Sequence, residues 1–336
     1  MNNVRSMLSK ISSFVPLSRM VQLTNQKVLL PFYHLVSDNR LAHISNLYQL
    51  RSIDDFENDL IYLLKYFKAI DASTLYSSVV SEEISKPVFH LTFDDGLSQI
   101  YNIVAPILER KNIPATFFVN TDFIDNKGLF YRYKVSLIIE SLHINNKDFA
   151  KISDLLKIDN SNVNSIIEQL KNLKYSDTQT IDTILKIQNI DIEKWLCENK
   201  PYLSSSQIND LITRGFKIGS HSVDHPRFKY LTIEEQKNQI TSSFTFLERN
   251  FGIKERFFSF PFSDEMVPKE ILTWLSEDQN CKLSFGISGL KKDVTKTHLQ
   301  RLLLEEGSLN ADKIISSEYL YYMLKSILNK NRIKRK

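Results

Sequence analysis

The sequence has few cysteines, and their positions exclude two classes of protein. Only Cys197 and Cys281 occur among the 336 residues, far apart and outside any CxxC or Cys/His pattern. A disulfide framework needs several cysteines, and a thiolate metal site needs them closely spaced. The chain is therefore predicted to have neither. Any metal must be held by histidine and carboxylate side chains.

Long apolar runs and an excess of one charge are also missing. No stretch approaches the length of a membrane span, and residues 1–20 are broken by serines, lysine and proline, unlike a secretory signal. The 43 basic and 39 acidic residues are spread along the chain and leave a net charge of +4. This balance predicts no nucleic-acid groove, and hence no nucleic-acid partner.

The two ends of the chain suggest contact with a membrane surface. Residues 1–26 are predicted to form an amphipathic segment, and the tail at 330–336 is basic. We expect a cytoplasmic protein that either packs this segment on its own domain or contacts the inner membrane peripherally. The apolar positions at helical spacing are Val4, Met7, Leu8, Ile11 and Val15.

Strand and helix patterns alternate along most of the chain. The expected strands are residues 27–36, 87–93, 114–120, 216–220, 256–260, 282–287 and 298–304. The expected helices are residues 53–67, 100–111, 205–214, 233–250, 269–276 and 311–328. Such alternation is typical of an α/β protein with a parallel sheet, open or closed into a barrel. Its site is expected at the carboxyl ends of the strands.

One long segment departs from this alternation. Residues 131–200 contain no glycine, are rich in lysine, asparagine and isoleucine, and show helical spacing, which predicts a helical insertion. No repeat or low-complexity linker flanks it. We therefore expect one domain over residues 27–308 that contains the insertion. A C-terminal helix and the basic tail follow at residues 309–336.

Two adjacent carboxylates end the second expected strand. The motif is TFDDG at Thr92–Gly96, in which the strand delivers Asp94 and Asp95. Neighbouring side chains at a strand end point in different directions. One carboxylate can then bind a cation while the other accepts a proton from water, as a hydrolytic metal site requires. The tripeptide alone is also an ordinary turn sequence.

Two histidines follow another expected strand, in HSVDHP at His221–Pro226. His221 and His225 can converge on one cation if the segment between them makes a helical turn, although Pro226 disfavours a long helix there. Such a pair also occurs among surface and core histidines. With Asp95 at the same rim, the set leaves coordination positions open for catalysis. We expect a divalent metal ion, zinc first, with nickel, cobalt or iron as alternatives.

Together these motifs resemble those of the polysaccharide deacetylases, the NodB homology domain of carbohydrate esterase family 4. The motif order is similar to that of poly-N-acetylglucosamine deacetylases, and the likeness covers residues 28–304 without the insertion. The resemblance implies a distorted (β/α) barrel that removes acetyl from an N-acetylhexosamine. It also implies Asp94 as general base and, as metal ligands, Asp95, His221 and His225.

The third family motif differs here. Many members carry an arginine that orients the base, whereas FSFPF at Phe258–Phe262 places Ser259 in that position. The resemblance still implies the Phe262 N–H, after Pro261, as oxyanion donor. Arg301 is our candidate for a replacement cation near Asp94, with a surface salt bridge as the alternative.

The general acid is expected from the front of the domain. LLPFYH at residues 29–34 matches the aliphatic-x-x-Tyr-His form of the poly-N-acetylglucosamine branch, which implies His34 as acid; a hydrogen-bonded core histidine is the alternative. We expect a hydrolase acting on an N-acetylated glycan or a lipid-linked precursor. Adjacent Asp94 and Asp95 suit metal sharing better than a two-carboxylate glycosidase. An inactive carbohydrate-binding protein on the same fold is the alternative function.

Overall fold

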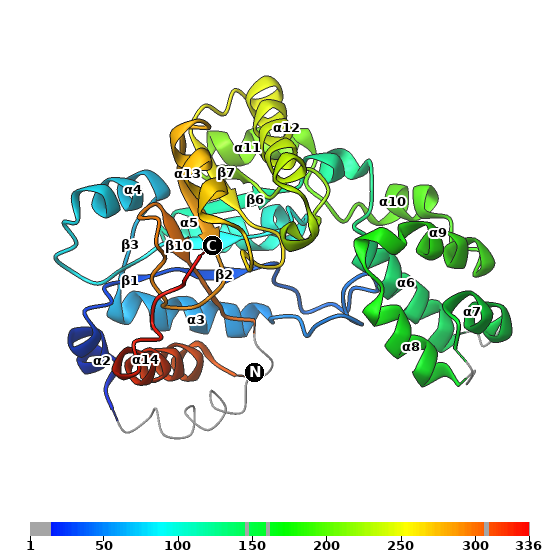
Figure 1. The fold of residues 1–336 in the computed structure, drawn as a ribbon, viewed down its shortest axis with the longest axis horizontal. Coiled ribbons are helices and arrows are strands. Elements are labelled where there is room, and N and C mark those ends of the chain that lie inside the picture. Colours follow the sequence, from blue (N-terminus) through cyan, green and yellow to red (C-terminus); the bar gives the residue numbers. More distant parts are fainter. Residues whose placement is uncertain (1–14, 145–147, 159–161, 306–308, 336) are drawn as a thin grey trace.

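The computed structural model describes residues 15–144, 148–158, 162–305 and 309–335, and it forms a parallel barrel wrapped by helices, with a helical lobe at one side (Figure 1). Neighbouring strands run parallel in the order β10-β9-β8-β7-β6-β5-β2-β11. The expected distorted (β/α) barrel is confirmed. Its strands are β2 (Pro31–Tyr33), β5 (Leu91–Phe93), β6 (Ala115–Val119), β7 (Lys217–Ser220), β8 (Arg256–Ser259), β9 (Cys281–Gly286), β10 (His298–Gln300) and β11 (Leu302–Leu303).

A single segment nearly closes the barrel. β10 and β11 are consecutive in the chain, separated only by Arg301, yet they occupy opposite edges of the sheet. β10 pairs with β9, and β11 pairs with β2. The Arg301 N–H donates to Gly286 O at 3.0 Å, and the next N–H, of Leu302, donates to Leu30 O at 2.8 Å. Arg301 is therefore the residue at which the chain passes from one edge to the other.

Two expected strands are each divided into two. Residues 27–36 form β1 (Val28–Leu29) and β2, and residues 87–93 form β4 (Val88–Phe89) and β5. The first halves join β3 (Lys68–Ala69) in a separate three-stranded sheet, in the order β1-β4-β3. Pro31 contributes to the division because it has no N–H to donate to a ladder. The second halves carry the chain into the barrel.

Helices cover the outside of the barrel, and several begin at capping residues. Ser52 accepts the Asp55 N–H at the start of α3, and capping boxes begin α11 and α12 at Ser204 and Thr232. The expected helix over 100–111 begins with a π-helical turn, since Pro106 cannot donate to Asn102. The helices are α3 (Ile53–Tyr66), α4 (Ala72–Ser81), α5 (Ala105–Arg110), α11 (Ser205–Thr213), α12 (Ile233–Phe251), α13 (Lys269–Glu277) and α14 (Ala311–Ile327).

The N-terminal segment predicted over residues 1–26 lies outside the described residues up to position 14. Within the predicted segment the described part contains α2 (Leu17–Thr24); no separate helix was predicted there, nor at α4. α2 buries Leu17, Met20 and Val21 in the same hydrophobic cluster as Phe93 of the barrel and Tyr319 of α14. None of the described helices has both the length and the apolar character needed to cross a membrane.

The insertion forms its own helical lobe, as expected. In Figure 1 the lobe stands to one side of the barrel. It has a separate hydrophobic cluster, which includes Ile138, Ile166 and Ile181, and residues from the loop after β2, such as Leu35 and Ile44, extend that cluster toward the barrel. The helices are α6 (Tyr131–Ile144), α7 (Phe149–Leu156), α8 (Val163–Asn172), α9 (Thr178–Ile187) and α10 (Ile192–Asn199).

The basic tail returns to the barrel. Lys292 and Arg332 form a parallel bridge, and the side chain of Arg335 is inserted between Asp264 and Asp293. These two carboxylates are 3% and 0% exposed, and the Arg335 guanidinium also donates to the carbonyls of Asp264 and Val267 at 2.9 Å each. Arg335 is thus engaged within the fold and is not available to an anionic surface.

Arg335→Ala is expected to lower the free energy of unfolding by about 3 kcal/mol, because two buried carboxylates lose their shared cation. Urea unfolding followed by circular dichroism measures this change. Lys334→Ala is the matched control, since it removes the neighbouring, exposed cation. Equal stability of the two variants would contradict a structural role for the tail.

Candidate active site at the carboxyl ends of the strands

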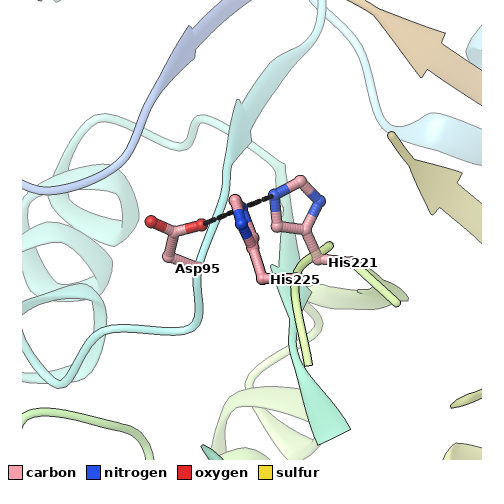
Figure 2. Close-up of side chains that lie close together, drawn as sticks. All are labelled: Asp95, His221 and His225. Atoms are coloured by element: carbon pink, nitrogen blue, oxygen red, sulfur yellow. Dashed lines mark hydrogen bonds and ion pairs between the residues drawn. The ribbon is translucent and has the colours of Figure 1, made fainter. Parts of the chain in front are cut away.

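Two strands bring three ligand-type side chains together. Asp95 follows β5, and His221 and His225 follow β7; all three are buried (Figure 2). Asp95 Oδ1 lies 3.4 Å from His221 Nε2 and 3.2 Å from His225 Nε2, and the two Nε2 atoms are 3.1 Å apart. The three residues that the sequence analysis grouped as metal ligands therefore form one compact cluster.

The backbone reaches this arrangement through left-handed residues. Asp95, Ser222 and His225 have φ angles of 70°, 71° and 64°. The segment between the histidines is a loop, so the helical turn considered for their convergence is absent. Each such residue costs about 1 to 3 kcal/mol and persists only where the surroundings hold it. Strain of this kind gathers at functional sites.

The donor atoms of the cluster fit a divalent cation. His221 Nδ1 lies 2.8 Å from Ser259 O; because a carbonyl only accepts, Nδ1 carries the proton and Nε2 presents a lone pair to Asp95. Burial lowers the pKa of His225 despite the nearby Asp95 charge, which favours neutral imidazole. Among the described residues, the buried Asp95 Oδ1 makes no hydrogen bond. Two imidazoles and a carboxylate are suitable ligands for zinc and for other divalent first-row transition metals.

The insertion contributes a contact that sequence reasoning missed. The Tyr133 hydroxyl, on α6, donates to Asp95 Oδ2 at 2.7 Å, so Oδ1 is the oxygen that faces the histidines. The Phe130 ring, just before α6, packs edge-on at 4.4 Å from the His225 ring. The only signal in the sequence was a cluster of aromatic residues at the start of the insertion. The lobe therefore helps to hold the site.

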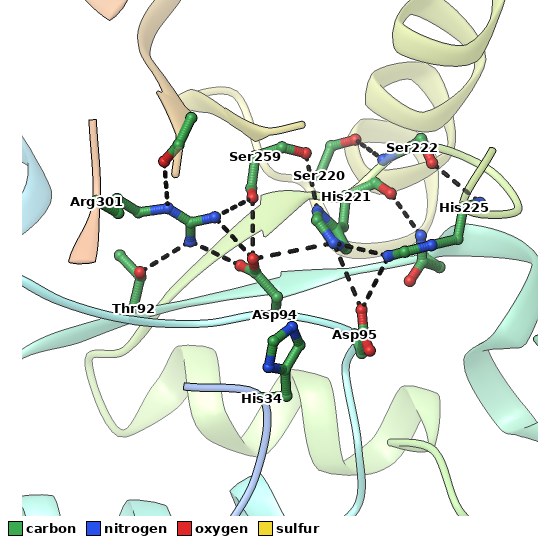
Figure 3. Close-up of polar contacts among 12 residues, drawn as sticks. His34, Thr92, Asp94, Asp95, Ser220, His221, Ser222, His225, Ser259 and Arg301 are labelled. Carbon is green, nitrogen blue, oxygen red and sulfur yellow. Dashed lines mark hydrogen bonds and ion pairs between the residues drawn. The ribbon is translucent and has the colours of Figure 1, made fainter. Parts of the chain in front are cut away.

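Asp94 lies beside the cluster in a bidentate ion pair (Figure 3). Arg301 Nη1 and Nη2 donate to its two oxygens at 2.8 and 2.7 Å. The Ser259 hydroxyl bridges the pair, 2.7 Å from Arg301 Nη2 and 3.2 Å from Asp94 Oδ2. Arg301 is fully buried, so the surface salt bridge considered for it is wrong. A short side chain at 259 leaves room for the guanidinium.

Opposing effects set the pKa of Asp94. Burial raises it, but the positive charge of Arg301, its hydrogen bonds and the nearby His34 imidazolium outweigh burial and hold it below its ordinary value. Asp94 is therefore ionised at neutral pH, with His221 Nε2 4.0 Å from its Oδ2.

His34 follows β2 and lies near Asp94 (Figure 3), and Glu305 binds it. Glu305 Oε2 lies 2.8 Å from His34 Nδ1, and Oε1 accepts the N–H groups of His34 and Leu35 at 2.8 and 2.9 Å. Burial lowers the pKa of His34, but the hydrogen bond and charge of Glu305 outweigh it and raise the pKa to about 9. Sequence reasoning missed Glu305, whose only signal was its place after the closing strand.

The loop after β8 places Phe262 and Pro261 against the cluster. The Phe262 ring lies 4.7 Å from the His225 ring, and its φ of 59° is again left-handed. Within the described ranges, the Phe262 N–H makes no hydrogen bond. It is thus a free backbone donor beside the three-ligand cluster.

The fold and the site together are a parallel (β/α) barrel with adjacent carboxylates and paired histidines at the carboxyl ends of its strands. The polysaccharide deacetylase family model matches residues 81–277, more than half of the chain, and the chain belongs to this family. His34, Arg301 and Glu305 lie outside the matched range, so their placement rests on this structure alone.

Solved structures share the fold. Streptococcus pyogenes deacetylase PplD in complex with acetate is 14% identical with a TM-score of 0.56, over 87% of this chain and 98% of that one. IcaB from Ammonifex degensii is 14% identical with a TM-score of 0.55, and the match covers 87% of this chain and 97% of that one. No curated protein sequence matches significantly. At this identity the likeness establishes the fold.

Glu305→Gln is expected to lower the pKa of His34 from about 9, because burial is then opposed only by the more weakly acting charges of Asp95 and Asp94. NMR titration of the His34 imidazole in chelator-treated protein measures this. Glu277→Gln, an exposed change on α13, is the control. A His34 pKa that stays near 9 in Glu305→Gln would show that another group holds the proton.

Proposed function

We propose that the protein is a metal-dependent deacetylase that removes acetyl from an N-acetylhexosamine in a glycan or a glycan precursor. Family membership supports glycan deacetylation. The observation that carries the residue assignment is the separation of two neighbouring carboxylates. Asp95 faces two histidines, whereas Asp94 is turned to Arg301.

Asp95, His221 and His225 are proposed to hold the cation. A divalent cation there acts as a Lewis acid on the amide carbonyl and makes water more acidic. Asp94 accepts the proton of the attacking water. It is suited to this step because it is ionised at neutral pH, and because Arg301 and Ser259 fix both of its oxygens.

His34 and Phe262 complete the proposed chemistry. The water oxygen bonds to the acetyl carbon, and the Phe262 N–H is proposed to donate to the carbonyl oxygen as negative charge develops there. When the C–N bond breaks, acetate leaves and the sugar nitrogen takes a proton. His34 is proposed to supply that proton from Nε2, since Nδ1 is directed to Glu305.

Asp94→Asn is expected to reduce acetate release from N-acetylglucosamine oligomers by about 100-fold or more, because the proton acceptor is lost, while metal content is retained. His221→Ala is expected to lose the metal as well. Acetate assay and elemental analysis of the purified variants measure both. Oligomer binding by wild-type protein without any acetate release would instead identify a carbohydrate-binding protein.

The pH profile tests His34. Its imidazole is protonated below its pKa, so wild-type activity is expected to fall as pH rises through 9 or somewhat lower, since a bound cation repels the imidazolium. Glu305→Gln should move this fall to lower pH. Rates across pH 5 to 10, about the range over which histidine titrates when perturbed, measure the shift. Identical alkaline limbs in both proteins would remove His34 from the assignment.

A further inference from the structure

Two arginines beside the site lack carboxylate partners. Arg132 and Arg227 are both partly buried, and within the described part of the chain neither forms an ion pair. The other described arginines are either ion-paired or exposed. The paired ones are Arg40, Arg51, Arg110, Arg214, Arg256, Arg301 and Arg335, and the exposed ones are Arg19, Arg249 and Arg332.

The Phe262 ring contacts both Arg227 and the metal-ligand cluster. Its guanidinium lies 3.9 Å from the centroid of the Phe262 ring, and that ring is 4.7 Å from His225. The other face of this small region is formed by the Tyr131 ring, 6.4 Å from the Phe262 ring. Arg227 and His225 therefore both contact the Phe262 ring, so Arg227 lies near the proposed reaction centre.

Arg132 comes to the same place from the insertion. It is in the first turn of α6, and its Nη1 donates to Lys171 O at 2.8 Å, which fixes the side chain. Burial lowers the pKa of Arg132; Tyr131 opposes this effect, and the positive charge of Arg227 adds to it. The charges of both arginines also act on the Tyr131 hydroxyl. The two guanidinium groups are thus close enough to repel each other.

Such a pair is costly unless an anion joins it. Two partly buried positive charges without a counter-ion lose hydration and repel each other. The amino end of α6 adds its positive dipole at the same position. A guanidinium group can donate two parallel hydrogen bonds to two phosphate oxygens. Two guanidinium groups together balance the two negative charges of a phosphate monoester, whereas a carboxylate carries only one.

We propose that Arg132 and Arg227 form a phosphate-binding subsite, so that the substrate is an N-acetylhexosamine carrying a phosphoryl group near the acetamido sugar. This inference rests on the proposed deacetylase function, because it places the phosphate relative to that reaction centre. The phosphate belongs either to a sugar phosphate monoester or to a diphosphate that links the sugar to a nucleotide or a lipid.

Binding to a matched pair of sugars tests the subsite. Zinc-loaded full-length Asp94→Asn protein, chosen to prevent turnover, is titrated calorimetrically with N-acetylglucosamine and with N-acetylglucosamine 1-phosphate. The phosphate is expected to tighten binding by about 10-fold or more, and Arg132→Gln or Arg227→Gln to remove most of that gain. Arg214→Gln, which removes an arginine paired with Glu109 on the surface, should keep it.

The source of the phosphate is distinguished by further ligands. Uridine diphosphate N-acetylglucosamine and vesicles containing a polyprenyl diphosphate N-acetylglucosamine are compared with the 1-phosphate, and the tightest Arg-dependent ligand identifies the source. Arg132→Lys and Arg227→Lys keep the charges if the glutamine variants fail to fold. Equal affinity for the two matched sugars overturns the proposal, as does a phosphate gain that persists in both glutamine variants, since the cation alone then binds phosphate.

Failure of the subsite and failure of the proposed function have different signatures. Acetate release from neutral oligomers without any preference for phosphorylated sugars would support the deacetylase function and contradict the phosphate subsite. Arg-dependent phosphate binding without acetate release from any of these sugars supports the subsite and removes the deacetylase.

Discussion

The buried ion pair between Arg301 and Asp94 is the interaction on which both the barrel and the site depend. A buried pair stabilises only where its geometry is good and its remaining donors are satisfied. Here the Arg301 guanidinium contacts both Asp94 oxygens, Thr92 Oγ1, Ser259 Oγ and Gly286 O. Its plane also lies 4.4 Å from the Phe32 ring. Arg301 is the residue between β10 and β11. The same residue therefore links the two edges of the barrel and keeps Asp94 ionised.

Much of this could be predicted from the sequence, and the limit is physical. The strands and helices follow from apolar periodicity, and Asp94, Asp95, His221 and His225 stand next to one another in short motifs. Glu305 lies 271 positions from His34, and Tyr133 lies 38 from Asp95. Contacts of that kind are set by how the barrel closes and where the insertion folds back, and no local pattern records them.

The elements that were missed have local causes. α2 begins immediately after Pro16 and its apolar stripe is short, only Leu17, Met20 and Val21, whereas α4 consists largely of small and β-branched residues, whose periodicity is weak. The left-handed residues at the site were equally hidden, because Ser222, His225 and Phe262 are not glycine. Only tertiary contacts hold such residues at positive φ.

Phe262 contacts residues of both the barrel and the insertion. Among the described residues its N–H makes no hydrogen bond, and its ring contacts both His225 and the Arg227 guanidinium. The insertion supplies Tyr133 to Asp95 and Arg132 to the charged region around Tyr131. In the proposed function the strand ends carry the groups that act on the acetamido group, and in the proposed subsite α6 adds Arg132. A lobe with no chemical motif of its own acquires a role because its first turn reaches the metal-ligand cluster.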